Sequence, residues 1–132
     1  MNPIKGEVVN AFSDDQLTYD KTMGDWRVHL GIDLAAEAGA QVVAAADGTV
    51  AEIYDDAFWG STVVIEHGNK LTTRYQNLMK KPVVAVGDAV TAGQVIGGVG
   101  STAEAERREV NHLHFVLLKD NKPVNPLDYL PK

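Results

Sequence analysis

Residues 62–75 read TVVIEHGNKLTTRY, and this stretch decides the fold class. Two runs rich in Val, Ile, Thr and Tyr, residues 62–66 and 71–75, flank the turn signal Gly68-Asn69. Residues of these types favour strands, and a glycine-bearing turn between two such runs predicts a β-hairpin. The stretch therefore predicts two neighbouring antiparallel strands.

Similar runs recur along the chain about every ten residues. They cover residues 41–45, 49–54, 94–99 and 112–118, and residues 86–97 read as two strand ends hinged on glycines. Regularly spaced short strands with glycine turns indicate a sandwich or barrel rather than βαβ units. We therefore predict an all-β fold, an antiparallel sandwich or half-open barrel with glycine-rich hairpins.

Two segments depart from this pattern. Residues 102–109 mix glutamates, alanines and arginines, which predicts a short polar helix or an ordered loop. Residues 123–130 contain two prolines and are expected to close the domain as irregular chain. The length of 132 residues suits a single domain covering residues 1–132, with residues 1–28 as an amino-terminal extension packed on it.

Composition excludes several classes of function. The net charge is −6 and the basic residues are scattered, which argues against nucleic acid as a partner. The absence of cysteine removes disulfides, thiol nucleophiles and cysteine-ligated zinc. No apolar run reaches the roughly 18 residues of a membrane span, and the first residues do not resemble a signal peptide. The sequence is therefore that of a cytosolic protein or of the soluble part of a longer chain.

Two short motifs carry candidate chemistry: HLGID at residues 29–33 and HLHF at residues 112–115. In a strand, His112 and His114 project to one face while Leu113 and Phe115 project inward. A histidine and an aspartate four residues apart, with a glycine between them, can converge across a tight bend. Together the motifs supply the imidazole and carboxylate ligands that zinc takes.

Three protein ligands leave a fourth position for water, as in catalytic zinc sites, and His112 is placed to act as a general base beside the metal. Each motif alone has an ordinary interpretation, because an HxH pair is more often a packing or surface feature. Three of the chain's four histidines fall into the two motifs, which favours a site. The fourth, His67, is expected to be a half-buried histidine that bonds a loop backbone.

The order of these motifs resembles a known family, the lysostaphin/LytM-type zinc metallopeptidases. The segments HLGIDLAAEAGAQVVAAADGTV, STVVIEHGN, VGDAVTAGQVIGGVGST and HLHF follow its pattern across residues 29–115. The resemblance implies a LytM-like fold of the duplicated-hybrid-motif type, with Zn²⁺ bound by His29, Asp33 and His114. It also implies that His112 is catalytic and that the substrate is a peptide cross-link of peptidoglycan in the bacterial cell wall.

One position departs from that family. Its members usually carry a Tyr-x-His-Leu segment whose histidine is a second catalytic imidazole, whereas residues 75–78 here read YQNL. Asn77 therefore stands where the catalytic histidine is missing, and an amide cannot carry a proton at neutral pH. Losing a positioned acid or base typically costs about 10²–10⁴ in rate. We therefore expect weak or lost endopeptidase activity.

Residues 12–19, 23–29 and 75–78 are also similar to the LytM-like domains of the stage II sporulation protein Q family. This resemblance implies an extracytoplasmic location in the cell envelope, in the intermembrane space of the forespore. It implies a membrane anchor outside the present sequence and a role in sporulation. The implied partner is a mother-cell membrane protein of the sporulation channel, of the stage III sporulation protein AH type.

Three hypotheses follow. The first is a zinc-bound interaction module with impaired catalysis, and the second is an active zinc metalloendopeptidase acting on peptidoglycan. The third, a cytosolic carrier of the carbohydrate or lipoyl type, is disfavoured because no lysine lies at the tip of the 87–97 hairpin. The aromatic residues Trp26, Phe58 and Trp59 are expected either to line the metal site, to face a partner or to cap the core.

Overall fold

The structure is a computed structural model that describes residues 3–4, 8–10, 13–20, 25–29, 31–37, 39–56, 60–79, 82–100, 112–120 and 122–126. For residues 8–29 it describes the backbone only. The strands are β1 (Val8–Asn10), β2 (Ser13–Asp20), β3 (Asp25–His29), β4 (Ile32–Ala35), β5 (Gln41–Val43), β6 (Gly48–Asp56), β7 (Gly60–Glu66), β8 (Leu71–Leu78), β9 (Ala89–Val90), β10 (Val95–Gly98), β11 (His112–Lys119) and β12 (Lys122–Val124). Within these ranges no helix has the length and apolarity needed to cross a bilayer.

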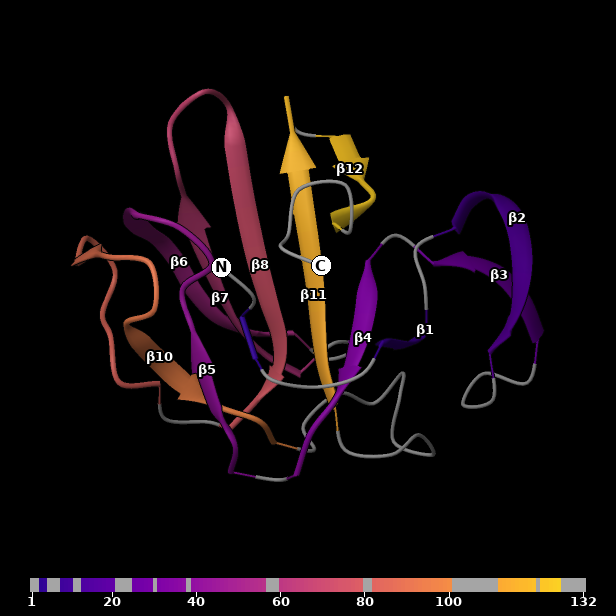
Figure 1. The fold of residues 1–132 in the computed structure, drawn as a ribbon, viewed down its shortest axis with the longest axis horizontal. Coiled ribbons are helices and arrows are strands. Elements are labelled where there is room, and N and C mark those ends of the chain that lie inside the picture. Colours follow the sequence, from indigo (N-terminus) through magenta and orange to yellow (C-terminus); the bar gives the residue numbers. More distant parts are fainter. Residues whose placement is uncertain are drawn as a thin grey trace.

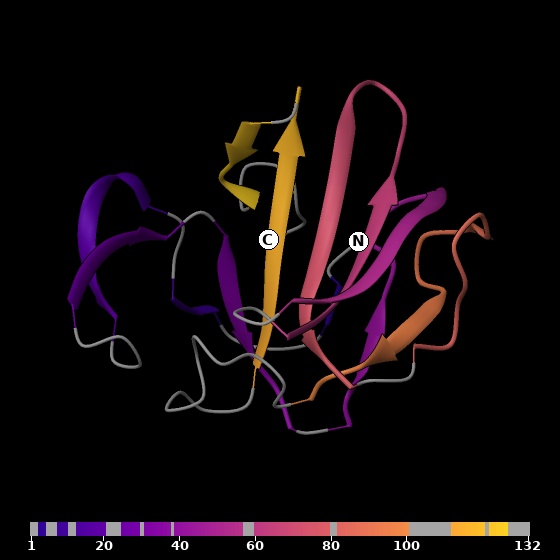
Figure 2. The same ribbon diagram turned by 180° about the vertical axis from the view of Figure 1, so that it is seen from behind.

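One large curled sheet dominates the molecule (Figure 1). Its strands follow the order β1-β4-β11-β8-β7-β6-β9, with β12 paired to β11, and all pairs are antiparallel. Two small sheets, β5–β10 and β2–β3, complete the fold. The β2–β3 hairpin lies at the β1 end of the large sheet and β10 at the β6 end, as both views show (Figures 1 and 2). The prediction of an all-β antiparallel fold is confirmed.

The hydrophobic core joins one face of the large sheet to the β5–β10 pair. Val42 from β5 and Ile96 from β10 pack in the same cluster as Ile32, Tyr75 and Phe115 of the large sheet. The Tyr75 and Phe115 rings lie 5.3 Å apart between centroids at a tilt of 59°. Such aromatic contacts stabilise a core beyond simple area burial. One face of the large sheet therefore forms part of the hydrophobic core.

Every predicted strand lies within or overlaps an observed strand, but the last segment was predicted wrongly in part. Lys122–Val124 form β12, which pairs with the end of β11. A proline is tolerated there because β12 is an edge strand, so the missing N–H of Pro123 removes no interior ladder bond. Residues 127–130 and the predicted helix at 102–109 lie outside the described residues.

The amino-terminal region contributes to the same sheet. β1 pairs with β4, with Asn10 opposite Asp33. Ile4 belongs to the core cluster, and the Pro3 carbonyl accepts a hydrogen bond from the Val43 N–H. The described part of residues 1–28 therefore touches both the large sheet and β5. The division of the chain into a domain and an extension stays a prediction.

Candidate metal centre

The second face of the large sheet carries the polar motifs. Along β11, Leu113 and Phe115 enter the core, whereas His112 and His114 lie on the opposite side. We call this side the histidine face. It comprises the residues that alternate with core residues: Asp33 and Ala35 on β4, His112, His114, Val116 and Leu118 on β11, Thr72, Arg74 and Gln76 on β8, and Thr62, Val64 and Glu66 on β7. The predicted orientation of the HLHF segment is confirmed.

Asp33 and His114 meet on this face. The two residues are direct partners in the β4–β11 ladder, and His114 Nδ1 lies 2.7 Å from Asp33 Oδ1. His112 Nε2 lies 3.7 Å from the same oxygen. All three side chains are at most 2% exposed. A buried carboxylate needs such partners, because leaving it uncompensated would cost several kcal/mol.

Gly31 allows β4 to approach β11 this closely. A Cβ placed on Gly31 would lie 2.7 Å from the Phe115 carbonyl oxygen and 3.1 Å from His114 Cε1. Contacts this short to backbone cannot be relieved by a side-chain rotation. The glycine of the HLGID motif therefore does more than permit a bend, because it lets Asp33 reach His114.

The third predicted ligand, His29, ends β3, and a bend at Gly31 leads into β4. Its side chain lies outside the described residues. Accordingly, the described side chains contain no group of three His, Cys, Asp or Glu that could hold a metal. The described pair still fits zinc, because the two atoms that approach each other, an imidazole nitrogen and a carboxylate oxygen, are both types that ligate it.

Asn77 sits beside this cluster in a β-bulge. Between Ser61↔Leu78 and Val63↔Tyr75, β7 advances two residues while β8 advances three, so one extra residue of β8 is inserted. Asn77 has φ 67°, and its Nδ2 donates to the His112 carbonyl at 2.8 Å. Bulges of this kind redirect a side chain and are common beside active sites. The structure thus brings Asn77 next to His112.

The histidine outside the motifs behaves as predicted. His67 is half-buried, its Nδ1 donates to the Asp47 carbonyl at 2.8 Å, and its Nε2 lies 2.6 Å from Thr73 Oγ1. The Thr73 hydroxyl in turn reaches Tyr75 Oη at 2.8 Å, and the Ala45 N–H donates to the same oxygen. Burial raises the pKa of Tyr75 to about 12, although these two hydrogen bonds act against the shift. His67 therefore belongs to a structural network.

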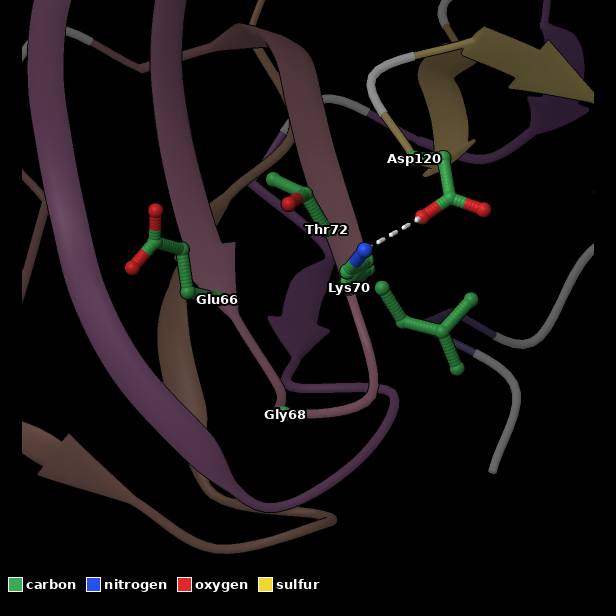
Figure 3. Close-up of a pocket in the computed structure, with 6 residues that line it drawn as sticks. Glu66, Gly68, Lys70, Thr72 and Asp120 are labelled. Atoms are coloured by element: carbon green, nitrogen blue, oxygen red, sulfur yellow. Dashed lines mark ion pairs between the residues drawn. The ribbon is translucent and has the colours of Figure 1, made fainter.

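A surface hollow of about 550 Å³ lies at the other end of β8 and β11 (Figure 3). Glu66, Gly68, Leu71 and Thr72 line it, together with Lys70 and Asp120, which form an exposed ion pair of 3.8 Å. Leu71 pairs with Lys119, five ladder positions from the pairing of Gln76 with His114. The hollow is therefore separate from the histidine cluster.

The sequence analysis did not single out the polar residues of the histidine face on β7 and β8, among them Thr62, Arg74 and Gln76. Gln76 is 2% exposed and is the direct ladder partner of His114. The available signal was the alternation of Arg74 and Gln76 with the buried residues Thr73 and Tyr75. The side chains of Trp26, Phe58 and Trp59 lie outside the described residues, so their predicted roles stay predictions.

Several curated bacterial proteins are similar to this chain. It is 37% identical over 118 residues to stage II sporulation protein Q of Bacillus subtilis, covering 88% of this chain and 40% of that protein. It is 38% identical over 99 residues to the peptidoglycan DD-endopeptidase ShyA of Vibrio cholerae, covering 75% of this chain and 22% of the relative. The chain thus spans less than half of the length of these relatives.

Solved structures show the same fold. A SpoIIQ chain crystallised in complex with SpoIIIAH matches with a TM-score of 0.83 at 31% identity, covering 98% of this chain and 99% of that one. A zinc-containing peptidase from Vibrio cholerae matches with a TM-score of 0.73 at 30% identity, covering 96% of this chain and 41% of that one. The model of peptidase family M23 matches residues 27–126, which include the histidine cluster and Asn77. This chain belongs to peptidase family M23.

Proposed function

We propose that this chain is a zinc-binding LytM-like domain of the cell envelope that serves in sporulation as an interaction module and has weak or lost peptidoglycan endopeptidase activity. One observation carries the proposal. The proposed ligands Asp33 and His114 are ladder partners, and Asp33 Oδ1 lies 2.7 Å from His114 Nδ1. The neighbouring bulge holds Asn77 instead of a titratable residue. The arrangement supports metal binding and speaks against efficient proton transfer.

The proposed zinc ligands are His29, Asp33 and His114. When bound, zinc lowers the pKa of a coordinated water and polarises the carbonyl that is attacked. His112 would hold or release a proton beside that position, since its Nε2 already lies 3.7 Å from Asp33 Oδ1. Asn77 cannot share this work, because its amide has no titratable proton and its Nδ2 is engaged by the His112 carbonyl.

The interaction role rests on similarity. The chain covers 99% of a SpoIIQ chain that was crystallised with SpoIIIAH, and it keeps the fold of that chain. We propose a membrane partner of the stage III sporulation protein AH type, in the space between mother cell and forespore, and an anchor outside the present sequence. We further propose that residues 1–132 form one domain with residues 1–28 packed on it as an extension.

A second candidate is an active zinc metalloendopeptidase that cleaves peptidoglycan cross-link peptides. The observation in its favour is the pairing of Asp33 with His114 beside a buried His112, combined with 38% identity to a peptidoglycan DD-endopeptidase. In this case His112 alone would have to supply the acid–base chemistry.

Zinc content tests the proposed metal site independently of the proposed interaction and of the peptidase activity. We expect one zinc per chain in the wild type by elemental analysis after dialysis, and loss of the metal in His114→Ala and Asp33→Ala. His67→Ala is the matched control, because it removes a histidine that lies outside the cluster. If His114→Ala keeps its zinc, or if the control alone loses it, the proposed site is wrong.

The interaction claim has its own test. The purified domain is mixed with the extracytoplasmic domain of a SpoIIIAH-type protein, and complex formation is followed by size-exclusion chromatography and calorimetry. We expect a stable complex that His114→Ala does not abolish, because the metal centre is proposed to support the fold rather than the interface. Absence of any complex would contradict the interaction role without affecting the zinc result.

A further inference from the structure

Arg74 is a half-buried cation on the histidine face for which the described residues provide no counter-ion. Its Nε is buried and has no hydrogen-bond partner. No ion pair or hydrogen bond of its side chain occurs with any described residue. Leaving a buried donor unpaired costs free energy, so a native structure that keeps one usually has a use for it.

The surroundings of Arg74 would strengthen an interaction with an anion. Its ladder partners are Val116 on β11 and Val64 on β7, which are only 5% and 6% exposed. The Arg74 stem therefore lies between two apolar side chains, where charge interactions are screened less than in water. The nearest carboxylates by register, Glu66 on β7 and Glu52 on β6, are both exposed and form no ion pair with Arg74 among the described residues.

Gln76 is the next residue on the same face and lies between Arg74 and the metal centre. Its Nε2 donates to Thr62 Oγ1 at 3.4 Å, and the Thr62 hydroxyl donates to the Gly60 carbonyl at 3.1 Å. These bonds orient the amide. Among the described residues, Gln76 Oε1 has no donor, which leaves an acceptor beside His114.

We propose that Arg74 and Gln76 form a carboxylate-binding subsite for a peptide that lies across the histidine face. Arg74 would bind one free carboxylate of the peptide through Nε and one Nη, and Gln76 Oε1 would accept a backbone N–H. The proposal rests on the proposed function in one respect, that this face receives a peptide. It does not require that the peptide is cleaved.

The chemistry favours a carboxylate over a more highly charged anion. The edge of a guanidinium offers two parallel N–H groups, which match the two oxygens of a carboxylate. A phosphate or a polyanion would need several cations, yet the other side chains of the histidine face are neutral or acidic apart from the histidines. The net charge of −6 would also repel a polyanion.

The test compares two peptides on the wild-type protein. The first is the peptidoglycan stem peptide L-Ala-γ-D-Glu-L-Lys-D-Ala with an amidated carboxyl end and a free glutamyl α-carboxylate. The second is the same peptide with that carboxylate converted to a carboxamide. Binding is measured by calorimetry or by NMR titration. We expect the carboxylate form to bind about tenfold or more tightly, because hydrogen bonds to charged groups are among the strongest.

Variants assign the effect to Arg74. In Arg74→Gln we expect the two peptides to bind within about twofold of each other, and in Arg74→Lys we expect partial discrimination because the fork is lost while the charge stays. Lys70→Gln is the matched control, since it removes an exposed cation from the same hairpin, and it should keep the full discrimination. Circular dichroism verifies that each variant is folded.

The outcomes are distinct. Three results would each overturn the subsite: equal binding of the two peptides by the wild type, no binding of the carboxylate peptide by the wild type, or full discrimination retained in Arg74→Gln. The wild-type comparison decides the question even if Arg74→Gln does not fold. Discrimination by a protein that binds no zinc would contradict the metal part of the proposed function while supporting the subsite.

Discussion

Asn77 combines a left-handed backbone conformation, φ 67°, with a side-chain bond to the His112 carbonyl. Its own carbonyl accepts a hydrogen bond from the Gly100 N–H. Asparagine and histidine are both enriched at positive φ among non-glycine residues. The bulge can therefore hold the histidine of the family pattern or an asparagine, and replacing one by the other changes the chemistry more than the backbone.

Substitutions at Asn77 should show an unusual order of stability. We expect Asn77→Ala to lower the free energy of unfolding by about 2 kcal/mol, because it adds the cost of a left-handed alanine to a lost hydrogen bond. Asn77→Gly should cost less, since glycine adopts positive φ freely. Urea denaturation measures both, and a glycine variant less stable than the alanine variant would contradict the strained bulge.

The raised pKa of Tyr75 predicts that the free energy of unfolding depends on pH in the alkaline range. Burial raises its pKa from 10.0 to about 12, so the folded state keeps the phenolic proton at pH values where the unfolded state has lost it. The stability contribution is complete below pH 10 and declines as the pH rises from 10 to 12, by about 3 kcal/mol in total. Unfolding followed across this range should show the decline.

Tyr75→Phe is the control for this titration. The variant loses the acceptor of the Ala45 N–H and should be less stable at neutral pH. It should also lack the Tyr75 part of the decline between pH 10 and 12. A decline of equal size in both proteins would show that other groups cause it.

At the scale of elements, the contact between β4 and β11 determines the metal centre. Gly31→Ala would place a methyl group 2.7 Å from the Phe115 carbonyl oxygen and so force the strands apart. We expect a loss of about 1–3 kcal/mol in unfolding free energy, together with weaker zinc binding.

Gly97→Ala provides the comparison for this strand contact. Its added methyl group would meet only Leu78 Cδ1 at 3.7 Å and Pro82 Cα at 3.9 Å, which are ordinary contacts. Chemical denaturation and zinc titration of both variants test the idea. Equal zinc affinity in Gly31→Ala and wild type would contradict the positioning role.

The sequence predicted the strands well where alternation and turn residues agree, as around Gly68-Asn69. It did not predict β1, β2 and β3 in the amino-terminal region. It also missed β4, which has four residues and begins in the HLGID motif, and β12, whose proline argued for irregular chain. The ladder that places Asp33 opposite His114 joins residues 81 positions apart, and a local pattern carries no information on that register. Alternation along β8 puts Arg74 and Gln76 on one face of their strand, but only the register with β11 shows that this face also carries His114.

At the scale of the whole molecule, the proposed metal ties together distant parts of the chain, since His29, Asp33 and His114 come from β3, β4 and β11. Zinc should therefore stabilise the entire fold. At a free zinc concentration about 100 times Kd, the gain is about 2.7 kcal/mol. We expect one cooperative thermal transition, shifted upward by zinc and restored by EDTA to its metal-free position.

The His114→Ala variant should show the same transition at a temperature that zinc does not change. Two transitions in the wild type would contradict the single-domain proposal. A zinc shift retained in His114→Ala would place the metal elsewhere.

The most direct test of the proposed function is hydrolysis of purified peptidoglycan by the zinc-loaded wild type, Asn77→His and His114→Ala, measured by the release of soluble fragments. We expect the wild type to release fragments at or near the rate of His114→Ala. We expect Asn77→His to exceed the wild type by about 10² or more, because a positioned acid–base group is restored. A wild type as fast as Asn77→His, with activity lost in His114→Ala, would contradict the proposed loss of activity and show an active endopeptidase that relies on His112.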